Sequence, residues 1–534
     1  MSLETSPQTA VQDWASLLGP AAVRLGADIP ASFRTDTSIA QRRVLAVLQV
    51  ERADQVPQVM RIAARHRCCI HPVSTGKNWG YGSALPASHD VVMLDLSRLQ
   101  GIDFDPELGV ATVEPGVTQA MLADAIRGHG FMVPTTGAGG LAGLLSNALE
   151  RGYGITPVTD HFSAVTDIEA VLADGNVYRS ALREAGSPQL ARLFKWGIGP
   201  YVNGLFSQSG FGIVTRVTIL LARRPEAVKV CLFNLKDDRL LDVAVDRIRQ
   251  VLQTLPGIVG GVNLMNQHRV LAMTAPYPQA DGLDSAGLMT QPTIARLGRQ
   301  YQIAPWTGFA TLYGSAQVVR AAQREIKRIL SGVASRLLFI SPGQAAFLER
   351  AAGMLPGAAA RKLASTLAKL NASMALIQGE PNEATALPLT YWRSRTTRPP
   401  TGMDPARDGC GLLWYAPLVP MRAADVRRFI DFAQKELVAH GLEPTITLTS
   451  QGDRLFDCTI PLLFDLGDAQ AARRAHQCLD HLTRAGRELG FYPYRLHVDA
   501  MQAHADRHPA SGALIDRLRR AWDPDDLIAP GRYR

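Results

Sequence analysis

The sequence predicts an α+β protein built from two domains, on the basis of its length and of two stretches with different patterns. The chain has 534 residues, which is too many for one ordinary hydrophobic core. Its first third alternates short apolar runs with helical periodicity, whereas residues from about 226 to 490 combine strand-like runs with long helices. The second pattern is typical of an antiparallel sheet covered by helices. Hydrophobic residues make up 46% and charged residues 19%, the profile of a globular protein.

The first third of the chain predicts alternating strands and helices. Residues 53–65 and 118–129 have the periodicity of amphipathic helices, and Thr118 is a suitable N-cap because its hydroxyl accepts hydrogen bonds from the first turn. Residues 164–172 and 176–179 predict a hairpin around the turn Ala173-Asp174-Gly175. Further strands are expected at 43–50, 68–74, 91–96, 110–113 and 212–221.

The segment from about 226 to 490 predicts the second domain. Long helices are expected at 424–440 and 469–489. Residues 393–405 are rich in Pro, Arg and Thr and lack periodicity, so we expect a loop there. Strands are expected at 228–235, 409–417 and 444–450.

Charge and cysteine content exclude several function classes. The net charge is +8, but Lys and Arg are scattered with no run of five or more, which favours a solvated surface over a nucleic-acid-binding face. The six cysteines form no CxxC pair, so no metal site is expected. The N-terminal segment MSLETSPQTA has no basic start or apolar run, and no stretch reaches about 18 apolar residues. We therefore expect a cytoplasmic protein that does not span a membrane.

The strongest local signal is the glycine-rich segment PVSTGKNWGYG at 72–82, which follows a predicted strand. Glycines and small hydroxyl residues let backbone N–H groups approach a pyrophosphate, and Lys77 can add positive charge. The spacing matches neither a Walker A loop nor a GxGxxG motif that opens a helix. Taken alone, the segment is equally compatible with a glycine-rich turn between two strands.

Three further segments resemble ligand-binding loops. Residues 137–154 (GAGGLAGLLSNALERGYG) are dense in glycine, which permits close backbone approach to a planar or phosphate ligand. The simpler interpretation is a small-residue helix followed by a turn. Residues 197–215 again run from glycines into a predicted strand, and residues 523–532 (DPDDLIAPGR) close the chain.

Taken together, these segments resemble one family, the vanillyl-alcohol oxidase/p-cresol methylhydroxylase (PCMH-type) FAD-linked oxidoreductases. The resemblance covers most of the chain and is closest at PVSTGKNWGYGSALP, ERGYGITPVTDHF, IEAVLADGNVYR, FKWGIGPYVNGLFSQSGFGIVT and DPDDLIAPGR. It implies a PCMH-type FAD-binding domain of two α/β subdomains at 1–225 and an antiparallel-sheet α+β substrate cap at 226–490. It further implies that residues 491–534 return to the FAD domain.

The resemblance also implies where FAD would lie. Ser74 to Asn78 would hold the pyrophosphate through loop backbone, and Gly212 to Val214 would lie by the adenine end. The full set of expected cofactor contacts is Val73, Ser74, Thr75, Gly76, Lys77, Asn78, Gly80, Tyr81, Gly82, Asn147, Glu150, Gly152, Gly154, Thr156, Gly212, Ile213, Val214 and Arg532.

The expected catalytic residues are Tyr81, Tyr494 and Arg495, which stand at motif positions where phenol-oxidising family members bind a phenolate oxygen. A deprotonated phenol pushes electrons toward its para carbon, so tyrosine hydroxyls and an arginine cation would promote hydride loss there. For the tyrosines, the simpler interpretations are a structural residue beside the loop for Tyr81 and a core-facing strand residue for Tyr494. An arginine such as Arg495 is rarely buried without a partner.

Some positions depart from the family pattern. Val158 stands where phenol-oxidising relatives carry a second tyrosine, and residues 135–149 contain no counterpart of the acidic residue that some oxidases place near the flavin. Leu412 and Thr390 stand where linking histidine and tyrosine residues would fall, although Tyr391 and Cys410 are close by. We therefore expect non-covalent FAD. We expect His161 to be a hydrogen-bonded structural histidine.

The sequence thus favours an FAD-dependent oxidase or dehydrogenase that transfers a hydride from a small aromatic or phenolic substrate to flavin N5. The alternatives are a non-phenolic alcohol, amine or biosynthetic intermediate as substrate, and a flavin-bound protein without redox turnover. The expected partners are the small-molecule substrate and an electron acceptor, either oxygen or a redox protein. Nucleic acid is not an expected partner, and a homo-oligomer is compatible with the sequence.

Overall fold

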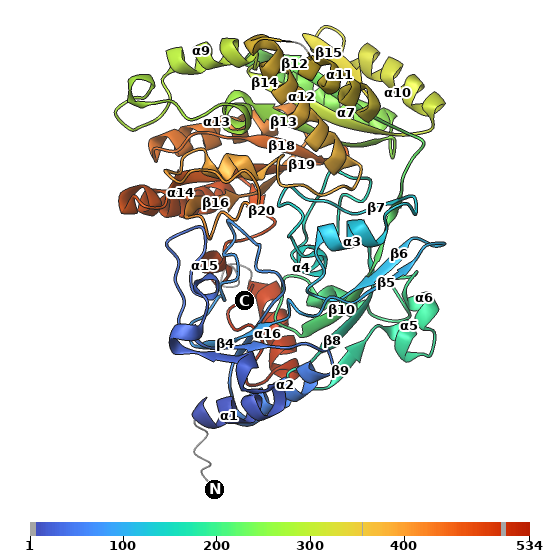
Figure 1. The fold of residues 1–534 in the computed structure, drawn as a ribbon, viewed down its shortest axis with the longest axis vertical. Helices are drawn as coiled ribbons and strands as arrows, with labels where there is room; N and C mark the ends of the chain where they lie inside the picture. Colours follow the sequence, from blue (N-terminus) through green and yellow to red (C-terminus); the bar gives the residue numbers. More distant parts are fainter. Residues whose placement is uncertain (1–6, 355, 503–508, 534) are drawn as a thin grey trace.

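The computed structural model describes residues 7–354, 356–502 and 509–533 and has two halves stacked along its long axis (Figure 1). The lower half contains the elements of the first 220 residues together with the C-terminal helix, and the upper half contains the elements from about 227 to 493. The fold is α+β, as the sequence predicts. Residues 1–6, on which part of the signal-peptide expectation rests, lie outside the described range.

The first sheet of the lower half has the strand order β1-β2-β4-β3. Its central strand β4 pairs in parallel with both β2 and β3, and every residue of β4 is buried, as expected for a parallel strand covered on both faces. The end of the chain joins this sheet, because Ile70 N–H donates to the Leu527 carbonyl at 2.7 Å and Ala529 N–H donates to the Ile70 carbonyl at 2.8 Å. The elements are α1 (Pro7–Leu18), β1 (Val23–Leu25), β2 (Val44–Gln49), α2 (Gln55–His66), β3 (Ile70–Val73) and β4 (Val91–Asp95).

The second sheet of the lower half is antiparallel, in the order β5-β6-β10-β8-β9. The predicted hairpin is present, with Val171 opposite Val177 and Gly175 at φ +79°, a conformation that glycine adopts without strain. The predicted N-cap is also confirmed, since the Thr118 side chain accepts from Met121 N–H at 3.2 Å. The elements are β5 (Ile102–Asp105), β6 (Val110–Val113), α3 (Gln119–Ala125), α4 (Leu144–Leu149), β8 (Val165–Val171), β9 (Val177–Arg179), α5 (Ala181–Glu184), α6 (Pro188–Ala191) and β10 (Ile213–Leu220).

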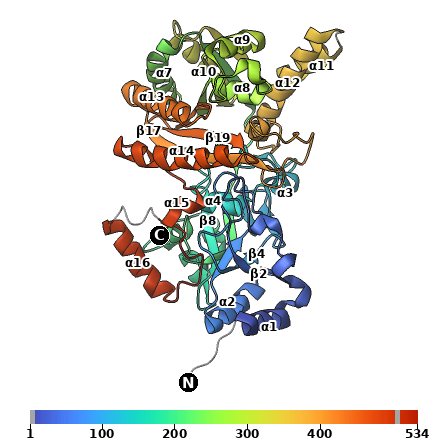
Figure 2. The same cartoon turned by 90° about the vertical axis from the view of Figure 1, so that its left-hand side faces the viewer.

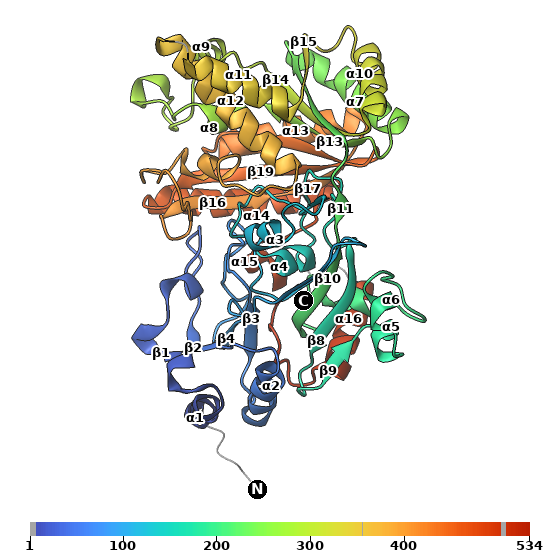
Figure 3. The same cartoon turned by 45° about the vertical axis from the view of Figure 1, so that its right-hand side comes forward.

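The upper half is built on one antiparallel sheet in the order β15-β12-β14-β13-β18-β19-β17-β20, with β16 pairing to β19. The largest core cluster lies where four helices pack on this sheet, and α11 and α12 lie in front of the upper half in Figure 3. The four core helices are α7 (Leu241–Thr254), α10 (Ala316–Ile329), α13 (Ala423–Ala439) and α14 (Ala469–Glu488). The strands are β12 (Ala227–Leu235), β13 (Val259–Asn266), β14 (Trp306–Gly314), β15 (Arg336–Ile340), β16 (Cys410–Tyr415), β17 (Pro417–Pro420), β18 (Thr447–Gln451), β19 (Leu455–Asp465) and β20 (Tyr492–Pro493).

Other helices and strands complete the two halves. In Figure 2, α14 runs along the base of the upper half and α15 lies just below it. The strands β7 and β11 pair with each other where the chain leaves the lower half. The remaining elements are β7 (Phe131–Met132), β11 (Ala222–Arg223), α8 (Gln267–Thr274), α9 (Gln291–Tyr301), α11 (Pro342–Met354), α12 (Ala358–Ile377), α15 (Val498–Met501) and α16 (Pro509–Trp522). Among the described residues, none of the helices is both long and apolar enough to cross a membrane.

The predicted strands and helices are present, with differences at their ends. The helix expected at 118–129 ends at Ala125, and the strand expected at 68–74 begins only at Ile70. The loop expected at 393–405 contains no helix or strand. The domain boundaries near residues 225 and 490 stay predictions.

Candidate active site

A cavity of about 380 Å³ lies between the two halves of the molecule. This volume falls within the range of small-molecule and cofactor sites. The lower half contributes the loop after β3 and the segment around α4. The upper half contributes α8, residues 386–390 in the segment that follows α12, and β16. Residues on the chain between β20 and α15 complete the wall. The site is therefore assembled from segments that are far apart in the sequence.

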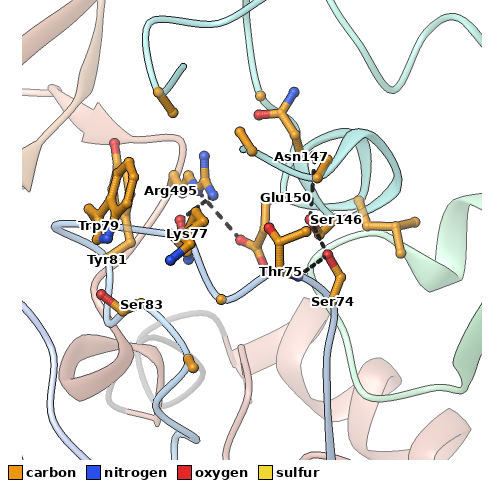
Figure 4. Close-up of a pocket in the computed structure, with 18 of the residues that line it drawn as sticks. Ser74, Thr75, Lys77, Trp79, Tyr81, Ser83, Ser146, Asn147, Glu150 and Arg495 are labelled. Carbon is orange, nitrogen blue, oxygen red and sulfur yellow. Dashed lines mark hydrogen bonds and ion pairs between the residues drawn. The ribbon is translucent and has the colours of Figure 1, made fainter. Parts of the chain in front are cut away.

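The glycine-rich loop forms a tight turn on the lower wall of this cavity. Tyr81 N–H and Ser83 N–H both donate to the Asn78 carbonyl, at 3.1 and 2.9 Å, and Gly76 has φ +67°. Ser74 Oγ donates to Ser146 Oγ at 3.0 Å, which joins this loop to α4. In Figure 4, Ser74, Thr75 and Ser146 lie close together on one side of the cavity. Hydroxyl groups and glycine backbone at a cavity wall are suited to hold the phosphates of a dinucleotide.

Most of the predicted cofactor contacts lie on this cavity wall. The residues that line it are Val73, Ser74, Thr75, Gly76, Lys77, Asn78, Tyr81, Asn147, Glu150, Gly152, Gly212, Val214 and Arg532.

The other predicted contacts, Gly80, Gly82, Gly154, Thr156 and Ile213, do not line the cavity. Gly80 and Gly82 serve close packing instead, because a Cβ at these positions would lie 2.3 Å from Trp414 and 2.5 Å from Val498. A Cβ on Gly154 would lie 2.4 Å from the Thr135 carbonyl oxygen. Thr156 is buried and donates to the Val158 carbonyl, and Ile213 belongs to a core cluster in β10.

Lys77 lines the cavity, but its charge has a partner in the upper half. Its Nζ lies 2.5 Å from Asp404 Oδ2, and Trp79 Nε1 donates to the other oxygen of the same carboxylate at 3.1 Å. The sequence predicts positive charge at this position for a pyrophosphate. The structure shows that Asp404 balances that charge, which leaves loop backbone and hydroxyl groups as the candidate phosphate donors.

The three predicted catalytic residues come together on the cavity wall. The guanidinium of Arg495 lies over the ring of Tyr81 at 4.5 Å, and its Nη2 donates to Asn78 Oδ1 at 2.6 Å. Its Nε lies 3.5 Å from Glu150 (Figure 4). The Glu150 carboxylate also pairs with Arg532. Strand β20 ends at Pro493, which allows both Tyr494 and Arg495 to reach the cavity although they are adjacent.

Buried polar groups surround Tyr494. Burial raises the pKa of both Tyr81 and Tyr494 above that of a free tyrosine, so both hydroxyls are neutral donors at neutral pH. Behind them, burial raises the pKa of Asp457 on β19 to about 7, against the opposing effects of a hydrogen bond from Tyr494 and the charge of Arg495. The ring of Tyr153 packs edge-on against Tyr494 with centroids 5.4 Å apart.

Sequence reasoning missed Tyr153, Asp457 and Arg269 as residues of this region. Tyr153 and Arg269 line the cavity, and Asp457 is 3% exposed directly behind it. Tyr153 lies within the glycine-rich segment and could have been found there. Asp457 and Arg269 carry no motif, because a single charged residue in a strand or helix usually faces solvent.

Positions that depart from the family pattern also have defined places. Leu412 and Thr390 line the cavity, whereas Tyr391 and Cys410 do not. The hydroxyl of Tyr391 instead donates to Asp408 at 2.6 Å, and Cys410 is fully buried. Neither of the two cavity-facing side chains of this set is therefore a histidine, tyrosine or cysteine that could form the flavin linkage.

Val158 and His161 lie away from the cavity wall. Val158 packs against a hydrophobic cluster of the lower half and does not line the cavity. His161 is buried and contacts the Asn147 side chain, and burial lowers its pKa to about 4. This geometry agrees with the structural role expected for His161.

Comparison with known proteins identifies the class of enzyme. A family model described as an FAD binding domain matches residues 44–181, the part that contains the glycine-rich loop. The chain is 32% identical over 543 residues to 1'-carboxy-chondrochloren decarboxylase of Chondromyces crocatus, covering 99% of this chain and 98% of that protein. It is 27% identical to the 4-cresol dehydrogenase (hydroxylating) flavoprotein subunit of Pseudomonas putida, covering 98% and 94%. Together with the cavity, these matches define an FAD-dependent oxidoreductase.

Solved structures extend the match to the whole fold. p-Cresol methylhydroxylase with substrate bound superimposes with a TM-score of 0.84 at 25% identity, covering 98% of this chain and 96% of that chain. The 4-ethylphenol oxidase from Gulosibacter chungangensis has the same fold, with a TM-score of 0.85 at 22% identity over 100% and 98% of the two chains. The chain belongs to the vanillyl-alcohol oxidase/p-cresol methylhydroxylase family of FAD-linked oxidoreductases.

Proposed function

We propose that this enzyme removes a hydride from the benzylic-type carbon of a small phenolic substrate. The observation that carries the proposal is the convergence of Tyr81, Tyr494 and Arg495 on one wall of the cavity, with the Arg495 guanidinium 4.5 Å from the Tyr81 ring. Two neutral hydroxyl donors and a cation are suited to stabilise a phenolate. Bound FAD supplies the hydride acceptor. Glycine-rich backbone and hydroxyl groups on the lower wall support its binding there.

The side chains around Tyr494 provide a path for the phenolic proton. The substrate hydroxyl would donate to Tyr494 Oη, and Tyr494 would donate in turn to the carboxylate of Asp457. With a pKa of about 7, Asp457 is poised to accept a proton near neutral pH. Arg495 then stabilises the phenolate that remains.

We propose that FAD is held without a covalent bond. Leu412 and Thr390 line the cavity, and neither is a histidine or a tyrosine. The Tyr391 hydroxyl donates its hydrogen bond to Asp408 instead. Acid precipitation should release the flavin into the supernatant. Flavin fluorescence that stays with the denatured chain would contradict this proposal and point to Tyr391 or Cys410.

A second candidate function is decarboxylation coupled to substrate oxidation. The observation that favours it is the 32% identity, over nearly the full length of both chains, to a protein named as a decarboxylase. A phenol whose benzylic carbon has lost a hydride becomes a quinone methide. A carboxylate on the adjacent carbon can then leave as CO2, and the electron pair of the broken bond restores the aromatic ring and forms an alkene.

An anaerobic substrate screen tests these proposals. Para-alkylphenols, para-hydroxybenzyl alcohols, phenols with a carboxylate on the side chain, and non-phenolic alcohols and amines are mixed with the holoenzyme, and flavin absorbance is followed. Rapid bleaching by phenols alone supports the first proposal, and release of CO2 with bleaching supports the second. Bleaching by non-phenolic compounds alone contradicts both, and no bleaching by any class favours a protein without turnover. Admission of air, or of an artificial one-electron acceptor, then distinguishes an oxidase from a dehydrogenase.

A further inference from the structure

Arg269 lies on α8 of the upper half with its backbone firmly fixed. The side chain of Asn266 caps this helix, because its Oδ1 accepts from Arg269 N–H at 3.0 Å and its Nδ2 donates to the Pro444 carbonyl at 2.6 Å. From this position Arg269 reaches the cavity wall and is only 7% exposed. The helix is therefore anchored to the loop before β18, and the arginine is held at the cavity.

The guanidinium of Arg269 lacks an anionic partner among the described residues. Its Nε and Nη1 are buried without a hydrogen-bond partner in that part of the chain. Burial lowers the pKa of Arg269 to about 10, and no carboxylate opposes this effect, so the group is still charged at neutral pH. The buried Arg519 provides a contrast, since its Nε donates to Asp526 at 2.6 Å. An unpaired buried cation is unfavourable, so such a group indicates a missing anion.

The surroundings of Arg269 are apolar. Its guanidinium carbon lies 5.9 Å from the centre of the Trp414 ring, and α8 contributes Leu271 to a hydrophobic cluster that also contains Leu389 and Leu412. In such surroundings a charged group interacts strongly with an ion of opposite sign. A planar guanidinium pairs best with a planar carboxylate through two parallel hydrogen bonds.

The position of Trp414 connects Arg269 to the predicted phenol site. The backbone N–H of Trp414 donates to the Gly80 carbonyl at 3.1 Å. The indole ring of Trp414 lies so close that a Cβ on Gly80 would be 2.3 Å from it. Gly80 directly precedes Tyr81, so one indole side chain links Arg269 to the segment that carries Tyr81. Arg269, Trp414 and Tyr81 all line the same cavity.

We propose that Arg269 binds a carboxylate of the substrate, so that the substrate is an aromatic acid held at its ring by Tyr81 and Tyr494 and at its carboxylate by Arg269. The inference rests on the proposed function, because it takes the cavity as the substrate site. The pyrophosphate of FAD is expected on the opposite wall, at Ser74 to Asn78, where Arg269 is not needed.

A matched pair of ligands tests this proposal. The holoenzyme is titrated anaerobically with 3-(4-hydroxyphenyl)propionate and with the corresponding neutral amide, and binding is measured from the change in flavin absorbance. We expect the acid to bind about ten- to hundredfold more tightly than the amide, the range expected for charge-assisted hydrogen bonds. In Arg269→Gln the acid should lose this advantage, with the amide changed less than about twofold, and Arg269→Lys should retain part of it. Arg320→Gln, which removes an exposed arginine on α10, is the control.

Four outcomes would contradict the proposal. Equal affinities for acid and amide in the unaltered enzyme would overturn the proposal. So would a loss of FAD content in Arg269→Gln, or an equal weakening of both ligands. Arg269→Met provides a test that does not depend on ligand, because removing an unpaired buried charge should raise the Tm of the apoprotein; a lowered Tm would show that Arg269 is structural. Tighter binding of the acid without flavin reduction by any phenol would contradict the proposed function but not this inference. Flavin reduction by phenols without tighter binding of the acid would contradict this inference but not the proposed function.

Discussion

The two walls of the cavity differ in how they treat polar groups. On the lower wall, Ser74 donates to Ser146 on α4, and the Asn78 carbonyl accepts from two backbone N–H groups of its own loop. On the other wall, ionisable side chains are buried with incomplete pairing: Asp457 has an oxygen without a hydrogen-bond partner among the described residues, and Arg269 has two such nitrogens.

This difference separates two tasks. A wall shaped by hydrogen bonds within its own loop is suited to a ligand of constant structure, such as a cofactor. A wall of incompletely paired charges gains most from a ligand that supplies the missing partners, which suits selection of a substrate. Changes on the first wall should therefore alter FAD content, and changes on the second should alter flavin reduction at constant FAD content. The four predictions below test this division.

The largest effect is expected at Arg495. Its replacement by Ala removes the cation that stabilises a phenolate, at a cost of about 2–4 kcal/mol in the transition state. Flavin reduction by a phenol should slow by about a hundredfold or more, measured by anaerobic stopped-flow at matched FAD content, and Arg495→Lys should restore part of the rate. Unchanged reduction rates would remove Arg495 from the catalytic wall.

A smaller effect is expected at Tyr494. Replacement by Phe deletes one donor to a charged oxygen, which is worth about 1.5–3 kcal/mol. Reduction by phenols should slow by about ten- to hundredfold, while reduction by non-phenolic compounds changes little. The comparison of the two substrate classes is the control. Equal slowing of both classes would assign Tyr494 a structural role.

On the lower wall, Gly76→Val should weaken FAD binding. Gly76 has φ +67°, a conformation that costs a residue with a Cβ about 1–2 kcal/mol, and the added Cβ would lie 3.2 Å from Ala84. We expect the Kd for FAD to rise about tenfold, measured by fluorescence titration of the apoprotein. Gly186→Val is the matched control, because Gly186 has φ +87° with nothing within 4 Å of its Cβ and lies outside the cavity. Equal weakening in both variants would attribute the effect to lost stability.

The smallest effect is expected for Asp457. Because burial raises its pKa to about 7, the carboxylate is mostly protonated below pH 7 and ionised above it. Reduction by phenols should therefore rise by a few-fold as the pH passes through 7, and this rise should be absent in Asp457→Asn. The pKa of this group is higher in the folded chain than in the unfolded one, so its contribution to stability should fall as pH rises from about 4 to about 7. A pH profile that is the same in both proteins would exclude Asp457 as the proton acceptor.

The same division explains how much could be predicted from the sequence. Glycines and small hydroxyl residues form a local pattern, so the turn at 72–82 could be predicted from the sequence. The position of Tyr494 and Arg495 at a ligand site could be predicted only because a family motif surrounds them, and their catalytic role stays a prediction. Arg269 and Asp457 were not found, because burial of a lone charge depends on how α8 and β19 pack in three dimensions. The placement of Lys77 was predicted, but its ion pair with Asp404, 327 residues away, was not.

The C-terminal tail has a consequence for how the enzyme is made. Cys69 and Asp526 are 457 residues apart in the sequence, yet the Cys69 thiol contacts the Asp526 carbonyl, and Ile528 completes the core beside β3. The core beside β3 is therefore complete only after nearly the whole chain has been synthesised. Cofactor insertion should accordingly be a late, post-translational event, and a nascent chain stalled before residue 520 should be unable to retain FAD.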